Sequence, residues 1–259
     1  MTKVMPSVFL GHGNPMNALE TNEYTQAWRR FGESVPRPRG ILAISAHWYL
    51  PSLAVTGSSA PKTIHDFGGF PEELYNITYP APGSPQLARE VQKLLLPLDV
   101  TMDEQRGMDH GTWAVLCHVF PDADIPIVQL SIDSSMNPQF HYETGCRLQS
   151  LRDEGILIVG SGNLVHNLHA YAWGRDKMPP YDWAVRFEET ARNLITEGKD
   201  SSLVDYQRLG DDALLSVPTP DHYLPLLYIL GLRREHETVS FPVEGFEGGS
   251  LSMLSVQIG

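Results

Sequence analysis

Short apolar runs recur along this chain, and helical patterns separate them. The runs that read as strands lie at residues 7–10, 41–45, 53–56, 127–132 and 156–160. Alternation of such strands with helices is typical of α/β folds, in which helices cover the faces of a sheet. The sequence therefore predicts an α/β architecture.

Several segments carry recognisable boundary signals. Residues 84–98 begin with Ser84 as an N-cap and Pro85 at the first helical position, and residues 137–155 begin with Asn-Pro and end in Gly. Residues 181–198 show a similar helical pattern. Residues 238–259 indicate two strands joined by a Gly-rich turn, which either pair with each other or join the main sheet.

One long segment, residues 58–82, has little periodicity and many Pro, Gly and aromatic residues. Loops of this length inside compact domains are uncommon and often functional. We interpret it as a wall or lid over a crevice, with a packed surface loop as the alternative.

Length and charge limit the function classes. A chain of 259 residues fits one large domain or two small ones. The net charge of −12 argues against nucleic acid or an anionic membrane as a partner. The sequence contains no run of eighteen apolar residues, so we expect no membrane span. Cys117 and Cys146 are far apart, which favours a reduced, cytoplasmic setting and excludes a thiolate metal site.

Three histidines directly follow or end strand-like runs. They are His12 in SVFLGHGNP, His47 in ILAISAHW and His166 in ILIVGSGNLVHN. Ligands of open α/β sheets bind at the carboxyl ends of the strands. Because neutral imidazole is a good ligand for iron and zinc, this pattern predicts a metal site at that edge.

Two further histidines stand out by context. His222 follows Thr219 and Pro220, which are a predicted N-cap and first helical residue, so His222 is expected in the first turn of a helix. His110 lies between Asp109 and Gly111, just before a helical run, in a setting that suits an acid/base group.

Plainer explanations remain for single residues. Each histidine alone can cap an element or fill a polar niche, and Asp221 and Glu244 are expected to serve surface or capping roles rather than a metal shell. Gly160-Ser161-Gly162 lacks the full G-x-S-x-G pattern of a serine hydrolase.

Several motifs occur in order along most of the chain, from about residue 7 to the C-terminus. They are GHGNPMNAL, SAHW, IHDFGGFP, YPAPGSP, MDHGTWAVL, PIVQLSID, SGNLVHNL, TPDHYLPLLY and PVEGFEGGSLSMLSVQ. Together they resemble the DOPA extradiol dioxygenases, which are class III, LigB-like ring-cleaving enzymes. The resemblance implies a single α/β catalytic domain, residues 1–259, with a central mixed sheet flanked by helices.

The resemblance also implies a site and a cofactor. His12 and His47 match metal ligands, and His222 matches the region that supplies the third. Other LigB-like enzymes place a glutamate there, so an all-histidine set suits Zn(II) as well as the Fe(II) expected for activity. His110 and His166 match the active-site histidines of the family.

Counting coordination positions assigns a role to His166. An octahedral metal has six positions, of which a chelating catechol takes two and O₂ one, so three protein ligands remain. We therefore predict that His166 is a fourth ligand or near-ligand at rest and an acid/base group in turnover.

The activity implied is the insertion of O₂ into a catechol, such as 4,5-cleavage of DOPA to a ring-opened semialdehyde. Phe67, Phe70 and Tyr75 are candidates to stack on the catechol, although core packing explains each equally well. A zinc-dependent hydrolase and a non-catalytic binding protein on the same fold are the alternatives. The expected state is a monomer or a small homo-oligomer.

Overall fold

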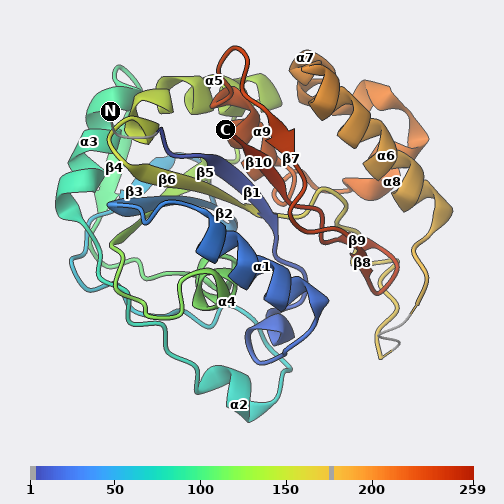
Figure 1. Cartoon of the computed structure of the whole chain (residues 1–259), viewed down its shortest axis with the longest axis horizontal. Helices are drawn as coiled ribbons and strands as arrows, with labels where there is room; N and C mark the ends of the chain where they lie inside the picture. Colours follow the sequence, from blue (N-terminus) through green and yellow to red (C-terminus); the bar gives the residue numbers. More distant parts are fainter. Residues whose placement is uncertain (1–3, 175–177) are drawn as a thin grey trace.

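The computed structural model describes residues 4–174 and 178–259, which fold around one mixed sheet flanked by helices (Figure 1). The sheet order is β4-β3-β5-β2-β6-β1-β10-β7. Its strands are β1 (Ser7–Gly11), β2 (Gly40–Leu50), β3 (Leu53–Thr56), β4 (Val100–Asp103), β5 (Ile127–Asp133), β6 (Ile156–Gly162), β7 (Val239–Ser240) and β10 (Val256–Ile258). A small hairpin, β8 (Phe246–Glu247) and β9 (Leu251–Ser252), lies outside it.

The centre of the sheet is parallel. Strand β6 pairs in parallel with both β1 and β2, and β2 pairs in parallel with β5. The antiparallel strands β10 and β7 extend the sheet beyond β1. The carboxyl ends of β1, β6 and β2 therefore meet at one edge, where α/β proteins bind their ligands.

Helices cover both faces of this sheet. They are α1 (Glu23–Ser34), α2 (Glu72–Tyr75), α3 (Pro85–Leu95), α4 (His110–Val119), α5 (Pro138–Arg147), α6 (Asp182–Glu197), α7 (Asp200–Val204), α8 (Asp211–Ser216) and α9 (Leu224–Gly231). The 3-10 turns are Pro15–Ala18, Gln149–Arg152 and Tyr206–Leu209. Figure 1 shows α1 and α4 on one side of the sheet and α5 and α9 on the other.

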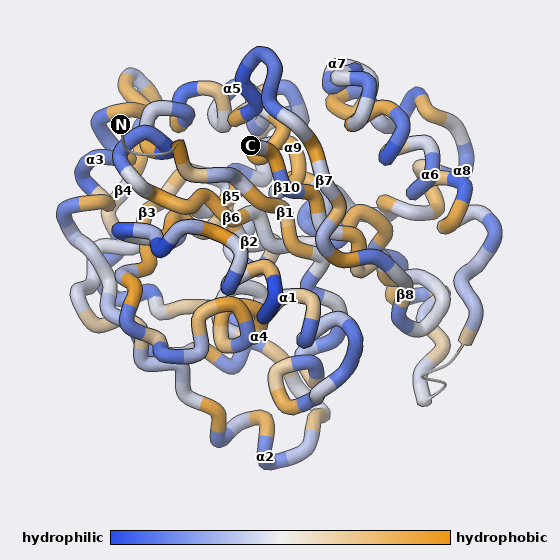
Figure 2. The backbone as a smooth tube through the Cα atoms, in the orientation of Figure 1, coloured by the Kyte–Doolittle hydropathy of each residue, from blue (hydrophilic) through white to orange (hydrophobic). Residues whose placement is uncertain are grey.

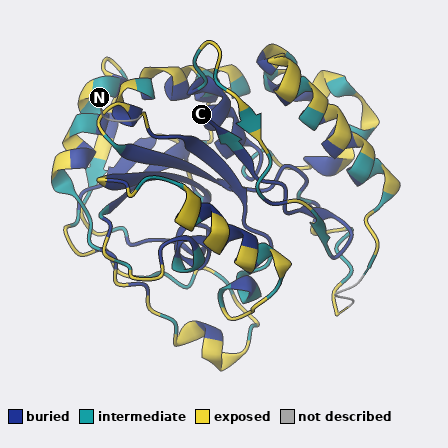
Figure 3. Ribbon diagram, viewed as in Figure 1, coloured by how far each residue is buried: buried dark blue, intermediate teal, exposed yellow. Residues whose placement is uncertain are grey.

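Alternating strand residues build two cores. In β2, Ile41 and Ala43 pack with α1 and α4, whereas Leu42 and Ile44 pack on the opposite face with α3 and α9. Successive side chains of a strand point to opposite faces, so a strand covered on both sides is apolar throughout. The central strands are accordingly buried and hydrophobic (Figures 2 and 3).

The helix starts predicted at Ser84 and Asn137 are confirmed, but the ends predicted for both helices are wrong, since the helix expected over residues 84–98 stops at Leu95. Ser84 caps α3 and Asn137 caps α5 through their side chains, each with Pro at the first helical position. The helix expected over residues 137–155 ends at Arg147, and a 3-10 turn follows. At the C-terminus both alternatives occur, since β8 pairs with β9 while β7 and β10 join the main sheet.

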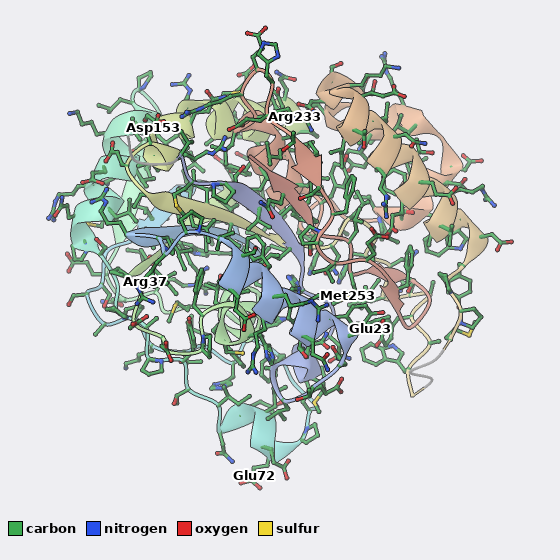
Figure 4. The ribbon with its side chains drawn as sticks, in the orientation of Figure 1. Glu23, Arg37, Glu72, Asp153, Arg233 and Met253 are labelled. Atoms are coloured by element: carbon green, nitrogen blue, oxygen red, sulfur yellow. The ribbon has the colours of Figure 1, made fainter. Side chains whose placement is uncertain are left out.

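Residues 58–82 form the predicted loop, interrupted only by the short helix α2. The backbone carbonyl of Ile64 accepts a hydrogen bond from Trp113 Nε1 at 2.7 Å, which anchors the loop to α4. Helix α2 lies at the periphery, where Glu72 points away from the molecule (Figure 4). No helix in the described part of the chain is long and apolar enough to cross a membrane.

Candidate metal centre

His12 lies where the sequence predicts, directly after β1. Its backbone N–H donates to the carbonyl of Gly162 at the end of β6, at 2.9 Å, and the side chain is buried. The pairing between β1 and β6 therefore fixes the backbone of His12 at the carboxyl edge of the sheet.

His47 does not follow its strand, as expected, but lies inside it. Strand β2 continues to Leu50, and its pairing with β5 breaks between Ile44 and Tyr49. Irregularities of this kind redirect side chains and are common beside active sites. The rings of His47 and His12 converge as predicted, although the predicted strand end is wrong.

His222 also lies at the site, but in a turn before a helix and not in the first helical turn that was predicted. Helix α9 begins at Leu224, and Thr219 does not cap it, so His222 lies in a turn just before the helix. The carbonyl of His222 accepts from Asn163 N at 3.0 Å, beside the end of β6. A side chain at Gly162 would collide with this carbonyl, so glycine is required for the close approach.

His12, His47 and His222 bring one ligand atom each within 4.8 Å of one another. Nε2 of His12 and Nε2 of His47 lie 3.3 Å apart. Two nitrogens bound to one metal at about 2.1 Å are separated by roughly 3.0–3.4 Å, so this spacing fits a shared cation.

The outer nitrogen of each of these rings lies near an oxygen atom. Nδ1 of His12 lies 3.0 Å from Ser161 Oγ, whose own hydroxyl donates to the carbonyl of Gly111. Nδ1 of His12 is therefore the donor, and its Nε2 keeps a lone pair. Asp221 accepts from Nδ1 of His222, and Asp66 Oδ2 lies 3.5 Å from Nδ1 of His47. Oxygen partners of this kind orient metal-binding imidazoles.

We expect Asp221→Asn to weaken metal binding about 10- to 100-fold without unfolding the protein, because outer partners of metal-binding histidines have effects of this size. The carboxylate suits this role, since burial would raise the pKa of Asp221 but its contact with His222 holds that pKa below the usual range. Competition with a chromophoric chelator measures the affinity. Asp212→Asn, at an exposed ion pair with Arg186, is the matched control; equal affinities in both variants would contradict the role.

Burial keeps the clustered rings neutral. Burial, and then the positive charge that neighbouring histidines would carry, lowers the pKa of His12 and His47 well below the usual value. The same causes lower the pKa of His166 to about 3. Neutral imidazole is the form that binds a metal, so the site is prepared for one at neutral pH.

This electrostatic arrangement predicts how stability depends on pH in the metal-free protein. Below about pH 6.5 the unfolded chain takes up protons on His12, His47 and His166 that the folded chain does not, so stability falls as pH falls. Each group contributes at most about 1.4 kcal/mol per pH unit. Glu188 opposes this, because burial raises its pKa to about 7. Urea unfolding from pH 7.5 to 5 is the test, and a flat or rising free energy of unfolding would contradict it.

His110 begins α4 rather than preceding it, with Asp109 as the N-cap. Its ring centroid lies 3.9 Å from that of His47, and Nδ1 lies 3.0 Å from Asp66 Oδ1. Burial opposes ionisation of Asp66, but its contacts with His110 outweigh burial and lower its pKa. Asp66 was not predicted as a site residue, and its position beside His65 in an aromatic loop is the only sign of it in the sequence.

His166 follows β6, as predicted, and stacks on His222 with ring centroids 3.5 Å apart and an interplanar angle of 4°. Among the described residues, His166 is not part of the three-histidine group. Its backbone is held on both sides, by a hydrogen bond from His166 N to the carbonyl of Ser216 and by a bridge to Leu251.

All five histidines line one cavity of about 220 Å³. Phe67 and Phe70, from the loop at residues 58–82, form part of its wall, and Leu168, Tyr171 and Trp173 also line it. Tyr75 is not in the wall and packs behind Phe67, with ring centroids 5.2 Å apart. The cavity thus combines a polar, metal-competent floor with aromatic sides, as small-molecule sites commonly do.

Comparison with known proteins agrees with this geometry. Residues 5–248 match the family model described as the catalytic LigB subunit of aromatic ring-opening dioxygenase. The chain belongs to the LigB family. It is an extradiol dioxygenase, an oxidoreductase that opens aromatic rings with O₂.

Named relatives share nearly the whole chain. A protein of Escherichia coli K12 named 4,5-DOPA dioxygenase extradiol is 53% identical, over 98% of this chain and 95% of its own. A protein of Beta vulgaris with the same name is 35% identical, over 96% and 94%. A crystal structure of an uncharacterized protein from Escherichia coli K12 superposes with a TM-score of 0.87 at 49% identity, covering 98% of this chain and all of the other.

The family model and this structural neighbour confirm the predicted fold class, a single α/β domain with a mixed sheet flanked by helices. LigB-family dioxygenases use a non-haem metal, and the three-histidine group of this member fits one.

Proposed function

We propose that this LigB-family member cleaves DOPA at the 4,5 position, with Fe(II) as the active metal and one catalytic domain spanning residues 1–259. The single observation that carries the proposal is the convergence of one ring nitrogen from each of three histidines at the floor of an aromatic cavity. The names of the relatives supply DOPA as the substrate to test first.

His12, His47 and His222 would hold the metal. Their Nδ1 atoms face Ser161, Asp66 and Asp221, an arrangement in which each Nε2 would present its lone pair to a cation. When bound, Fe(II) supplies the redox-active centre through which a catechol reacts with O₂, which otherwise reacts slowly for spin reasons. Zn(II) fits the same donors but has no redox chemistry.

His110 would act as the base for a catechol hydroxyl. Asp66 faces its Nδ1, so Nε2 of His110 is left to take the proton. The ring of Phe67 packs edge-on against His110, with centroids 5.4 Å apart, and excludes water from one side of it. A positioned general base of this kind typically contributes 10²–10⁴-fold.

His166 would move protons at the other side of the cavity. Stacking on His222 and the bridge to Leu251 fix its ring without engaging it in the three-histidine group. The role as a fourth ligand in the resting protein stays a prediction. Holding two imidazoles on different sides of the substrate allows one to accept a proton while the other donates one.

Product analysis tests the substrate and the position of cleavage. The protein is loaded anaerobically with Fe(II) and given DOPA under ¹⁸O₂. We expect a ring-opened semialdehyde that carries two labelled oxygen atoms and cyclises through its own amine. Cleavage of other catechols but not DOPA would overturn the substrate assignment. Equal turnover with Zn(II) would overturn the metal assignment.

We expect the enzyme to work in the cytoplasm, since Cys117 and Cys146 are both free thiols. We also expect a monomer or small homo-oligomer that acts on a catechol and O₂.

A further inference from the structure

We propose that Asp109, which touches neither the metal group nor the cavity, is the positioning residue that sets His47 and His110 relative to each other. The inference rests on the proposed metal site, but its test does not require turnover.

Asp109 is fully buried, and both of its carboxylate oxygens accept hydrogen bonds. Oδ1 accepts from Ser45 Oγ at 2.6 Å and from Thr112 N at 3.2 Å. Oδ2 accepts from Gln129 Nε2 at 2.8 Å, and Arg106 Nη2 lies 3.4 Å away. Buried carboxylates are retained only when their lone pairs are satisfied in this way, so the network has one geometry.

Two of these partners also hold the backbone of His47. Ser45 Oγ, whose hydrogen goes to Asp109, accepts from His47 N at 3.2 Å. Arg106 Nη2 donates to the carbonyl of His47 at 3.3 Å. Pairing of β2 with β5 is interrupted at this point, so these contacts replace the missing ladder bonds. Both backbone groups of a candidate metal ligand thus depend on groups that Asp109 anchors.

The same carboxylate fixes His110. Asp109 is the N-cap of α4, and its hydrogen bond to Thr112 N holds the first turn, which begins at His110. That turn packs directly on the ligand, since a side chain at Gly111 would lie 2.5 Å from Ser45 Oγ and 2.9 Å from His47 Cδ2. One buried group therefore determines how the candidate base approaches the candidate ligand.

The sharpest test separates the link to His47 from the stability of the helix. Ser45→Ala removes the hydroxyl between Asp109 and His47 N, whereas the cap of α4 and the contacts with Gln129 and Arg106 stay. We expect the affinity of the metal-free protein for Co(II) to fall about 10- to 100-fold, with a changed visible absorption spectrum of the bound Co(II). Ser84→Ala, which removes the N-cap of α3 far from the site, is the matched control and is expected to bind Co(II) as the parent does.

Exchanging the carboxylate and the amide between Asp109 and Gln129 tests whether Co(II) affinity can be restored. Asp109→Asn places an amide donor against Gln129 Nε2 and Arg106, so the contact of Arg106 with the His47 carbonyl is expected to loosen and Co(II) affinity to fall. Adding Gln129→Glu returns a carboxylate opposite that amide and beside Arg106, and is expected to recover at least part of the affinity.

Unchanged affinity and spectrum in Ser45→Ala would overturn the proposal, even where Asp109→Asn fails to fold. Equal loss in Ser84→Ala would overturn it too, because the effect would then be general stability. Oxygen uptake by the Fe(II)-loaded parent, measured in parallel, tests the proposed function separately. A parent that binds Co(II) but cleaves no catechol would leave the role of Asp109 to be decided by the affinities alone.

Discussion

Replacing His12 by alanine is expected to abolish oxygen uptake and to reduce metal affinity by more than about 100-fold. Loss of an outer partner of a metal-binding histidine costs 10- to 100-fold, and loss of the ligand itself should cost more. Nε2 of this candidate ligand lies 3.3 Å from that of His47, so removal of the His12 ring would leave His47 and His222 without a third donor.

The measurement is the metal content and affinity of the purified variant, together with its oxygen uptake. His236→Asn, at an exposed histidine with φ 68°, is the control, because asparagine tolerates that backbone conformation. The His236→Asn control is expected to bind the metal as fully as the parent protein does. A His12→Ala protein that kept a stoichiometric, tightly bound metal would show that His12 is not a ligand.

The second large effect separates catalysis from binding. His166→Ala is expected to lower kcat by about 10²–10⁴-fold, the usual contribution of a general acid or base. Metal affinity is expected to change by only a few-fold, because the three-histidine group does not include His166. The ring that stacks on His222 is lost, but Asp221 still holds Nδ1 of His222.

Single-turnover kinetics on protein loaded with one Fe(II) per chain measures the chemical step directly. His166→Gln, which restores bulk and a polar end without an exchangeable ring proton, should remain as slow as the alanine variant. If His166→Ala instead lost most of its metal, His166 would be a ligand and not an acid/base group.

Local sequence signals placed two of the five histidines correctly. His12 and His166 follow apolar runs bounded by glycine or polar residues, and the structure places both after their strands. Capping signals at Ser84 and Asn137 likewise predicted helix starts, because a cap is a contact between near neighbours in the chain.

Other positions depend on contacts that are distant in sequence. The break in β2 at His47 is supported by Arg106 and Asp109, some sixty residues away, and no local pattern records it. His222 precedes α9, and its carbonyl lies against Gly162, sixty residues earlier in the chain, a contact that the local helix signal of Thr219 and Pro220 does not record.

Asp66 shows the limit of periodicity most clearly. It lies in an aperiodic loop, and only the folded chain brings its carboxylate between His47 and His110. The loop was predicted to cover a crevice, and Phe67 and Phe70 do line the cavity. Asp66, which the same loop carries, was not predicted, because its role depends on contacts with His110 in α4 and His47 in β2.

The stoichiometry of oxygen consumption tests whether the enzyme cleaves a catechol ring with O₂. The metal-free protein is loaded with one Fe(II) per chain without air, mixed with DOPA, and exposed to a measured amount of O₂. We expect one O₂ to be consumed per DOPA, with a yellow ring-opened product formed at the same rate and neither signal in His12→Ala. No oxygen consumption with DOPA or with a panel of small catechols, despite stoichiometric bound Fe(II), would contradict it.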